Sequence, residues 1–325
     1  MNLDDTPESQ NVEDLRDSDA TRGSGPFGGG MGGGGFGGGG GGGGFPLPIG
    51  GGSIGLVIVV VAALFFGLDP AALLGGGSGG SGGQFQPAPP QMRPAPQAQP
   101  GQTGTRPAGR EDAMRTFVAK VLKTTEAVWE EQLPRQLNRQ YVKPTLVLFS
   151  GAVRSACGMA DAAVGPFYCP GDQRVYIDLS FYEQLARRFG APGDAAQAYV
   201  IGHEIGHHIQ NQLGILRKAQ EAKGAMSRGR ANEVQVRVEL QADCFAGVWV
   251  FHADRQGRVL EPGDVDEALT AAAAIGDDRL QRQARGYVQP ETFTHGTSEQ
   301  RQRWFKRGLQ SGDMRACDTF NTQTL

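Results

Sequence analysis

The sequence predicts an α+β domain that is mostly helical with a small sheet and occupies residues 110–325. Two observations predict this class. Apolar residues at helical spacing dominate this part of the chain, whereas only two runs, 145–149 and 174–179, are rich in the branched and aromatic residues typical of strands. Most helical segments follow the strands, an order that favours an α+β arrangement over a doubly wound sheet.

Capping signals and apolar periodicity mark the expected helices. Ser180 with Glu183 and Thr297 with Gln300 have the spacing of capping boxes, and Asp194 is expected to cap the longest central helix. The expected helices are 110–132, a short one from 180, 195–213, 232–254, one capped by Asp264, and 297–309. Residues 167–169 and 174–179, separated by Pro-Gly-Asp-Gln, predict a hairpin.

The first 109 residues fall into three parts by composition. Residues 1–44 are expected to be a disordered tail, acidic at first and then nearly all glycine. Residues 45–68 carry no charge and end in a dense apolar run, which predicts one transmembrane helix. Residues 69–109 are rich in Gly, Ser, Pro and Gln and are expected to be a linker. This organisation predicts a folded domain held at a membrane.

The four cysteines all lie in the expected domain and contain no Cys-x-x-Cys pair. An even count after a membrane anchor favours disulfides in an oxidising compartment, with four unrelated thiols as the alternative. Cys157 and Cys169 flank an expected bend and are paired locally, which leaves Cys244 with Cys317. We therefore expect a single-pass protein of the cell membrane with an extracytoplasmic domain, although the charges flanking the span give no orientation.

The candidate metal ligands lie in His203-Glu204-Ile-Gly-His207, on the helix expected at 195–213. His203 and His207 are four residues apart and share one face of the helix, so their imidazoles can bind one zinc ion. Glu204 lies about 60° round from His207 at about 100° per residue, beside the metal, where it can accept a proton from water. His208 lies on another face and is expected to have no metal role.

A third protein ligand is needed, and two glutamates are candidates. The metzincin pattern is excluded because Gln210 and Leu213 stand where it requires glycine and histidine. Glu239 is favoured because Asp243, one turn later, can accept the outer N–H of a zinc-bound histidine. Glu233 is a weaker candidate without such a partner. The alternative in which Glu239 and Asp243 form a solvated helix face is disfavoured by the apolar residues around them.

These motifs resemble the bacterial neutral zinc metallopeptidase family, whose members are membrane-anchored, gluzincin-like zincins. The resemblance extends to five further segments, namely Asn11-Val-Glu-Asp14, 165–170, 176–181, 274–279 and 293–301. It implies a zincin fold, Zn²⁺ as the cofactor and hydrolysis of peptide bonds in a protein or peptide substrate.

From the motif and the resemblance we expect a membrane-anchored metalloendopeptidase. Zinc bound by His203, His207 and Glu239 would activate a water molecule, with Glu204 as the general base. His295 is a candidate donor to the developing oxyanion, because it lies in a polar loop before a capped helix, although a local loop role fits it equally well. Tyr287 and Arg301 are the other candidates. The polar stretch 219–231 is expected to be a loop that could cover the site.

Two other classes of function stay open. A membrane-tethered scaffold could keep the fold without turnover, and a zinc hydrolase could act on cell-wall amides instead of proteins. Nucleic acid is excluded as a partner, because a formal net charge of −3 with interspersed charges leaves no basic stripe. The sequence does not indicate the oligomeric state.

Overall fold

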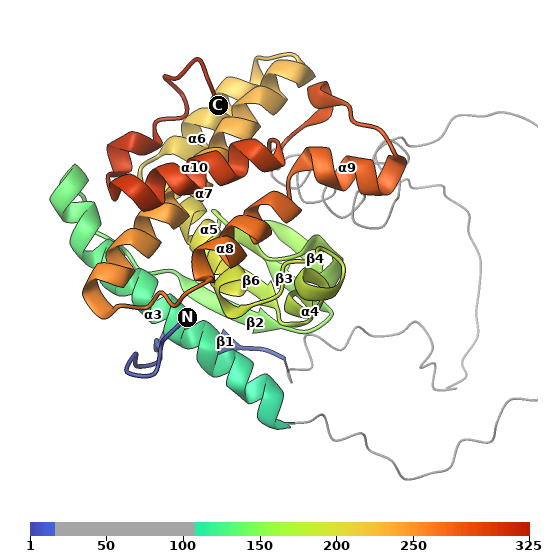
Figure 1. Cartoon of the computed structure of the whole chain (residues 1–325). Coiled ribbons are helices and arrows are strands. Elements are labelled where there is room, and N and C mark those ends of the chain that lie inside the picture. The colour runs from blue at the N-terminus through green and yellow to red at the C-terminus, as the bar shows by residue number, and fades with distance from the viewer. Residues whose placement is uncertain (17–107) are drawn as a thin grey trace, which may run out of the picture.

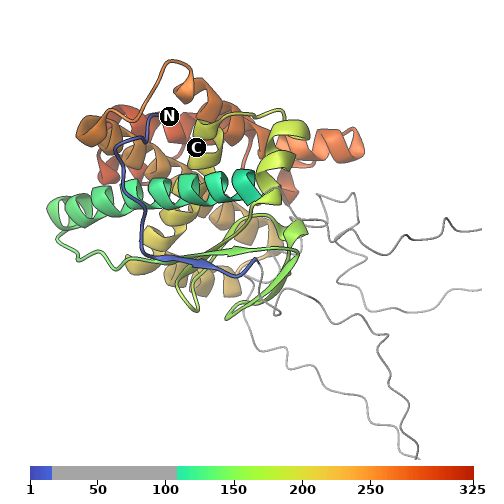
Figure 2. The same ribbon diagram turned by 90° about the horizontal axis from the view of Figure 1, so that it is seen from below.

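The computed structural model describes residues 1–16 and 108–325, which form two sheets and eight α-helices (Figure 1). The predicted α+β class is confirmed, since helices predominate over one four-stranded sheet and one separate hairpin. Most helices gather on one side of the sheet (Figure 2). Residues 1–16, which the sequence analysis placed in a disordered tail, pack against the predicted domain and belong to the same fold.

The main sheet has the strand order β1-β2-β6-β5. β1 (Val12–Asp14), β2 (Thr145–Phe149) and β6 (Arg174–Asp178) are parallel, and β5 (Phe167–Cys169) pairs antiparallel with β6. The strands predicted at 145–149 and 174–179 and their hairpin are confirmed. A second hairpin, β3 (Ala152–Ser155) with β4 (Gly158–Asp161), was not predicted.

The helices follow the predicted order, with two additions. They are α3 (Ala108–Leu137), α4 (Ser180–Arg187), α5 (Asp194–Gln212), α6 (Ile215–Gly224), α7 (Arg228–Gly257), α8 (Asp264–Ala274), α9 (Asp277–Arg285) and α10 (Ser298–Ser311), with 3-10 turns at Ala162–Val164, Pro290–Thr292 and Met314–Cys317. α6 and the start of α7 occupy most of the stretch predicted as a loop at 219–231, so that prediction was wrong.

Of the capping predictions at Ser180, Asp194, Asp264 and Thr297, only the one at Thr297 is confirmed. At α10, Thr297 and Gln300 form both hydrogen bonds of a capping box. At α5 the cap position is Gly193, and Asp194 lies inside the helix without a capping hydrogen bond. The Asp194 carboxylate instead lies 2.7 Å from the backbone nitrogen of Met1. The expected box at Ser180 is absent, since Leu179 precedes α4 and no side chain caps that helix.

α7 is the central helix of the domain and is packed between α5 and α10. Both crossings are very close. A Cβ added at Gly206 of α5 would lie only 2.8 Å from the Ala242 carbonyl oxygen of α7. A Cβ at Gly308 of α10 would lie even closer to the carbonyl oxygen of Cys244. Only glycine permits such contacts between helix backbones. The positions of side chains on α7 relative to α5 are therefore tightly fixed.

Both predicted disulfides are present, Cys157–Cys169 and Cys244–Cys317. The first joins the β3–β4 connection to β5, and the second ties the turn after α10 to α7. No cysteine is free. The second bridge closes a loop of 73 residues that includes α8, α9 and α10, and loops of this length give large stabilisation in the chain-entropy account.

Residues 1–16 are part of the folded domain, so the prediction of a disordered tail is wrong for them. Leu3 is buried in the main core, and β1 extends the sheet beyond β2. Ser9 Oγ and Asn11 Nδ2 donate to one oxygen of the buried Glu126 carboxylate, at 2.6 and 2.7 Å. Composition failed here because this segment is stabilised by partners more than a hundred residues away, which no local pattern reveals.

The remaining N-terminal predictions lie outside the described residues. They are the tail from residue 17 to 44, the transmembrane helix at 45–68 and the linker up to residue 107. Among the described residues, no helix combines the length and apolarity needed to cross a bilayer.

The hydrogen bond from Ser9 to Glu126 provides a test of the packed N-terminal segment. Ser9→Ala removes one donor from a buried carboxylate and should lower the free energy of unfolding by about 1–3 kcal/mol. Gln10→Ala is the matched control, because Gln10 is exposed. Urea unfolding of both variants measures the effect. Equal stability of Ser9→Ala and wild type would contradict a folded role for residues 1–16.

Candidate metal centre

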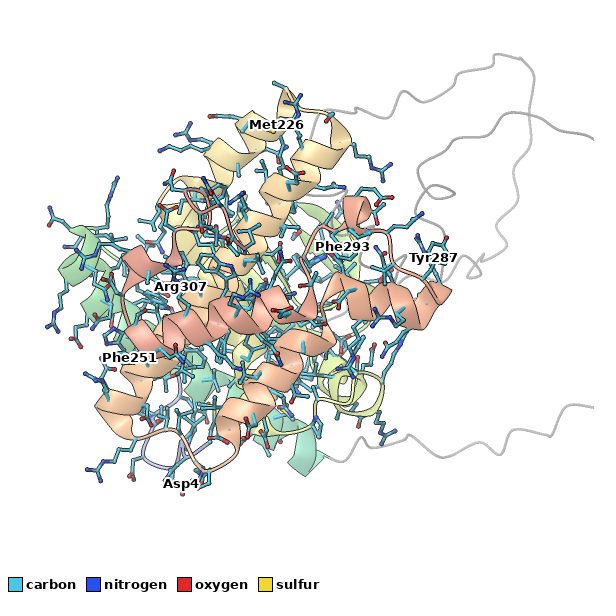
Figure 3. All side chains as sticks on the ribbon, turned by 45° about the horizontal axis from the view of Figure 1, so that its top comes forward. Asp4, Met226, Phe251, Tyr287, Phe293 and Arg307 are labelled. Atoms are coloured by element: carbon cyan, nitrogen blue, oxygen red, sulfur yellow. A yellow bond between two sulfur atoms is a disulfide. The ribbon has the colours of Figure 1, made fainter. Side chains whose placement is uncertain are left out.

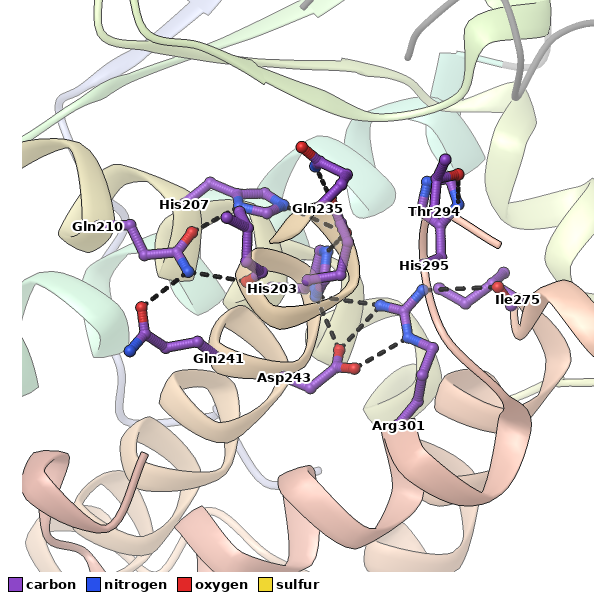
Figure 4. A network of polar contacts seen from close by, with 12 residues as sticks. His203, His207, Gln210, Gln235, Gln241, Asp243, Ile275, Thr294, His295 and Arg301 are labelled. Carbon is purple, nitrogen blue, oxygen red and sulfur yellow. Dashed lines mark hydrogen bonds and ion pairs between the residues drawn. The ribbon is translucent and has the colours of Figure 1, made fainter. Parts of the chain in front are cut away.

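Two helices bring three ligand groups to one point. His203 and His207 lie one turn apart on α5 (Figure 4). Glu239 approaches them from α7. The Glu239 Oε2 atom lies 3.2 Å from His203 Nε2 and 3.5 Å from His207 Nε2. One ligand atom from each residue falls within 4.8 Å of the others. This set of two imidazole nitrogens and one carboxylate fits the donor chemistry of zinc with one position left open.

The outer nitrogen of each histidine is held by a hydrogen bond. His203 Nδ1 lies 2.8 Å from Asp243 Oδ1, and His207 Nδ1 lies 2.8 Å from Gln210 Oε1 (Figure 4). Both partners accept, so each Nδ1 carries the proton and each Nε2 offers its lone pair to a metal. Gln210 is in turn fixed by donating to the Val238 carbonyl oxygen, 2.7 Å away on α7. The ligand orientations are therefore set before a metal binds.

Asp243 is the centre of a buried charged network behind His203. Arg301 of α10 donates to both Asp243 oxygens, at 2.9 and 2.8 Å. The Tyr199 hydroxyl donates to Asp243 Oδ1 at 2.5 Å. Asp243 and Arg301 are almost completely buried, so each charge depends on the other for compensation. Asp243 therefore lies where the sequence analysis placed it, next to a histidine ligand, whereas Arg301 supports Asp243.

The facing charges also set the protonation of the ligands. Burial disfavours the imidazolium form of His203, but Asp243 and Glu239 outweigh it and raise the pKa of His203 to about 9. Burial disfavours the charged form of Glu239 as well, but the two histidines hold its pKa well below the usual range. Metal binding at neutral pH therefore displaces a proton from His203.

Glu204 lies next to the ligands without joining them. Its side chain lines the same cavity as the three ligands and is buried. Within residues 1–16 and 108–325, no group forms a hydrogen bond or ion pair with its carboxylate. Burial raises the pKa of Glu204. A carboxylate that is buried, unpaired and adjacent to a metal site is suited to accept a proton.

The cavity above the ligands is largely apolar. β5, the connection before it, α4, α5, α6 and α9 contribute to its wall. Its principal apolar side chains are Val164, Phe167, Phe181, Val200, Leu216 and Leu280. Such a wall excludes water from part of the site and accommodates hydrophobic parts of a ligand.

His295 enters this cavity from the loop before α10. Asp277 Oδ2 accepts the backbone N–H of Thr294 at 2.7 Å and that of His295 at 2.6 Å, which fixes the loop. The other oxygen, Asp277 Oδ1, lies 3.2 Å from His295 Nδ1. Burial lowers the pKa of His295, but the buried Asp277 carboxylate outweighs it and raises that pKa. Asp277 was not singled out from the sequence, although it lies in the segment 274–279 that carries the family resemblance.

Three other residues from the sequence analysis lie away from the ligands. His208 is fully buried and bonds to the Val142 carbonyl oxygen at 2.6 Å, and burial lowers its pKa to about 4. Glu233 is exposed on α7 and is not part of the ligand cluster. Tyr287 is 56% exposed after α9 (Figure 3) and does not line the cavity. The structure thus does not bring His208, Glu233 or Tyr287 to the metal position.

Comparisons with known proteins agree with this geometry. The model of the family described as "Putative neutral zinc metallopeptidase" matches residues 1–320. The uncharacterized protein YpfJ of Escherichia coli strain K12 is 44% identical over 313 residues, which cover 96% of each chain. The uncharacterized protein Rv2575 of Mycobacterium tuberculosis strain H37Rv is 46% identical over 228 residues, 66% of this chain and 74% of that one. No solved structure matches the chain.

Two histidines on one helix and a glutamate on a second helix define a class of proteins with mononuclear zinc centres. The chain belongs to the neutral zinc metallopeptidase family, whose model covers nearly its whole length, including the N-terminal segment. Its cofactor is accordingly Zn²⁺.

The two glutamates considered as third ligand can be compared directly. Glu239→Gln should weaken zinc binding by at least about 100-fold, because it replaces an anionic ligand by a neutral amide. Glu233→Gln is the control on the same helix and should bind zinc as wild type does. Competition with a zinc chelator measures both affinities. If the two variants lose zinc equally, Glu239 is not the ligand.

Proposed function

We propose that this protein is a zinc metalloendopeptidase in which Glu204 is the general base. The family is one of zinc metallopeptidases, which supports peptide-bond hydrolysis at the level of the class. The observation that carries the assignment of the base is the buried, unpaired Glu204 carboxylate on the wall that also presents the three ligands. A site that only stored zinc would not need a second carboxylate there.

When bound, zinc supplies a Lewis acid that lowers the pKa of a coordinated water and polarises the scissile carbonyl. Glu204 accepts the proton of the attacking water and then donates it to the nitrogen of the leaving amine. Asp243 and Gln210 keep the two histidines oriented throughout.

His295 is the proposed donor to the developing oxyanion. Its ring lines the cavity, and Asp277 faces its Nδ1 atom, which leaves Nε2–H free to donate. Arg301 also lines the cavity, but its guanidinium is engaged with Asp243, so its role is to support the ligand shell. Among the three candidates from the sequence, His295 therefore fits this role best.

The proposed place of action is an oxidising compartment outside the cytoplasm. The two disulfides support it, because structural disulfides persist mainly in such compartments. The proposed substrate is a protein or peptide, and the apolar cavity wall favours extended segments with hydrophobic side chains.

Glu204→Gln separates a peptidase from a silent scaffold. The variant keeps the shape of the side chain but cannot accept a proton, so cleavage of an unfolded protein such as casein should fall by about 10²- to 10⁴-fold. Its zinc content and melting temperature should remain near those of wild type. Glu233→Gln controls for the loss of one negative charge.

The proposal fails if the zinc-loaded wild-type protein cleaves no peptide bond, or if Glu204→Gln cleaves as fast as wild type. Parallel incubation with peptidoglycan distinguishes a hydrolase of cell-wall amides, which would release amide-cleaved fragments while leaving casein intact.

A further inference from the structure

One cation on the cavity wall pairs with no carboxylate among the described residues. Lys223, near the end of α6, lines the cavity together with the metal ligands. Its Nζ atom donates to the side-chain oxygen of Gln235 at 2.6 Å. The other cationic side chains of the wall are compensated, Arg301 by Asp243 and His295 by Asp277. Of the lysine and arginine side chains that line this cavity, Arg301 is paired with a carboxylate and Lys223 with a neutral acceptor.

The position of this ammonium group is tied to the metal centre. Gln235 Nε2 donates to Glu239 Oε1 at 2.8 Å, while its oxygen accepts from Lys223. One glutamine therefore connects the lysine to a zinc ligand. Gln235 and Glu239 are one turn apart on α7, so their side chains are neighbours on one helix face. The hydrogen bond from Lys223 to Gln235 therefore holds the ammonium group near the ligand Glu239.

The surroundings of Lys223 favour an anionic ligand. Leu216 and Ala219, on the same helix, and Val238 of α7 line the same cavity. In such an apolar environment an ion pair is stronger than at the surface, because water screens it less. Burial lowers the pKa of Lys223, so a carboxylate partner would stabilise its charged form.

We propose that Lys223 is a specificity-determining residue that binds a carboxylate of the peptide substrate while its scissile bond lies at the metal. This inference rests on the proposed function and names a feature of its substrate. The carboxylate has two sources with the same chemistry, the free C-terminus of a peptide or an Asp or Glu side chain. Lysine donates to either as a compact charge with three N–H groups.

The test measures peptide binding in the full-length, zinc-loaded Glu204→Gln variant, where turnover is blocked. Three peptides of one sequence are compared, namely the free acid, the C-terminal amide, and the amide with glutamate introduced at successive positions. The acid or a glutamate peptide should bind at least about tenfold more tightly than the neutral amide. Adding Lys223→Met should reduce that preference to about one. Lys218→Met is the control on the same helix, since Lys218 is exposed and outside the cavity.

Which peptide is preferred identifies the source of the carboxylate. Equal dissociation constants for all three peptides, or a preference that survives Lys223→Met, would overturn the inference. Failure of the proposed function is seen separately, as absence of cleavage by wild type of the peptide that binds most tightly.

A second inference comes from the packed N-terminal segment. β1 pairs with β2 over three residues, and the Asn2 and Ser9 N–H groups donate to the carbonyl oxygens of Val259 and Ala119. Glu13 also forms an ion pair with Arg174 of β6, at 2.7 Å. These contacts join the two described ranges, 1–16 and 108–325, in one sheet and one core.

Strands of one sheet must share a compartment, whereas one bilayer crossing between residues 16 and 108 would separate them. We infer that residues 1–16 and 108–325 lie on the same side of any membrane to which the chain is attached. The packed N-terminal segment and the single-pass arrangement expected from residues 45–68 therefore exclude each other in the folded protein.

Single cysteines at two exposed positions test this inference in intact cells. Asp5→Cys marks the N-terminal segment and Lys306→Cys marks α10, and the native cysteines are all paired and do not react. A membrane-impermeant maleimide should label both variants alike, either both in intact cells or both only after permeabilisation. Labelling of one variant in intact cells and of the other only after permeabilisation would overturn it. The variant without added cysteine is the control for background.

Discussion

The close crossing of α5 and α7 is the constraint on which the site depends. At Gly206 the helices approach until a Cβ would lie 2.8 Å from a backbone oxygen of α7. Gly206 stands directly before His207, so this close approach of the two helices lies beside the metal position. At this separation the short Glu239 side chain reaches both imidazoles, and Asp243 reaches the back of His203. A wider crossing would leave three potential ligands that could not share one ion.

α10 holds the other side of the same arrangement. It packs against α7 at Gly308, the Cys244–Cys317 disulfide ties the turn beyond it to α7, and its Arg301 compensates Asp243. Burying the Asp243 carboxylate without this arginine would lower the stability of the fold, because the charge would be uncompensated. The same holds for burying Arg301 without the carboxylate. The same helix is preceded by the loop that carries His295. Metal ligands, their support and the proposed oxyanion donor are therefore positioned by the contacts of α7 with its two neighbours.

Some of this site could be predicted from the sequence because the relevant geometry is local. The spacing of His203, Glu204 and His207 fixes their directions on one helix, and the same holds for Glu239 and Asp243 on another. Lys223 and Asp277 could not be assigned, because their positions depend on how α6 and α9 pack against the cavity. The periodic strands and helices were predictable for the same local reason.

The N-terminal segment shows the limit of that reasoning. Its charged and polar residues indicated a disordered tail, yet they bind to partners in α3 and the sheet that follow much later in the chain. Asp194 was similarly predicted to cap α5, but Gly193 takes that position and the carboxylate faces Met1. In both places a long-range contact replaced the local one that the pattern indicated.

The central claim is that one zinc ion is bound between α5 and α7 by two imidazoles and one carboxylate. Diffraction from zinc-loaded crystals, recorded on both sides of the zinc absorption edge, tests it most directly. The account predicts a single strong anomalous peak at about 2.0–2.2 Å from His203 Nε2, His207 Nε2 and a Glu239 oxygen, with Glu204 outside bonding distance. A peak at another position, or one with Glu204 in place of Glu239 among its ligands, would contradict the account.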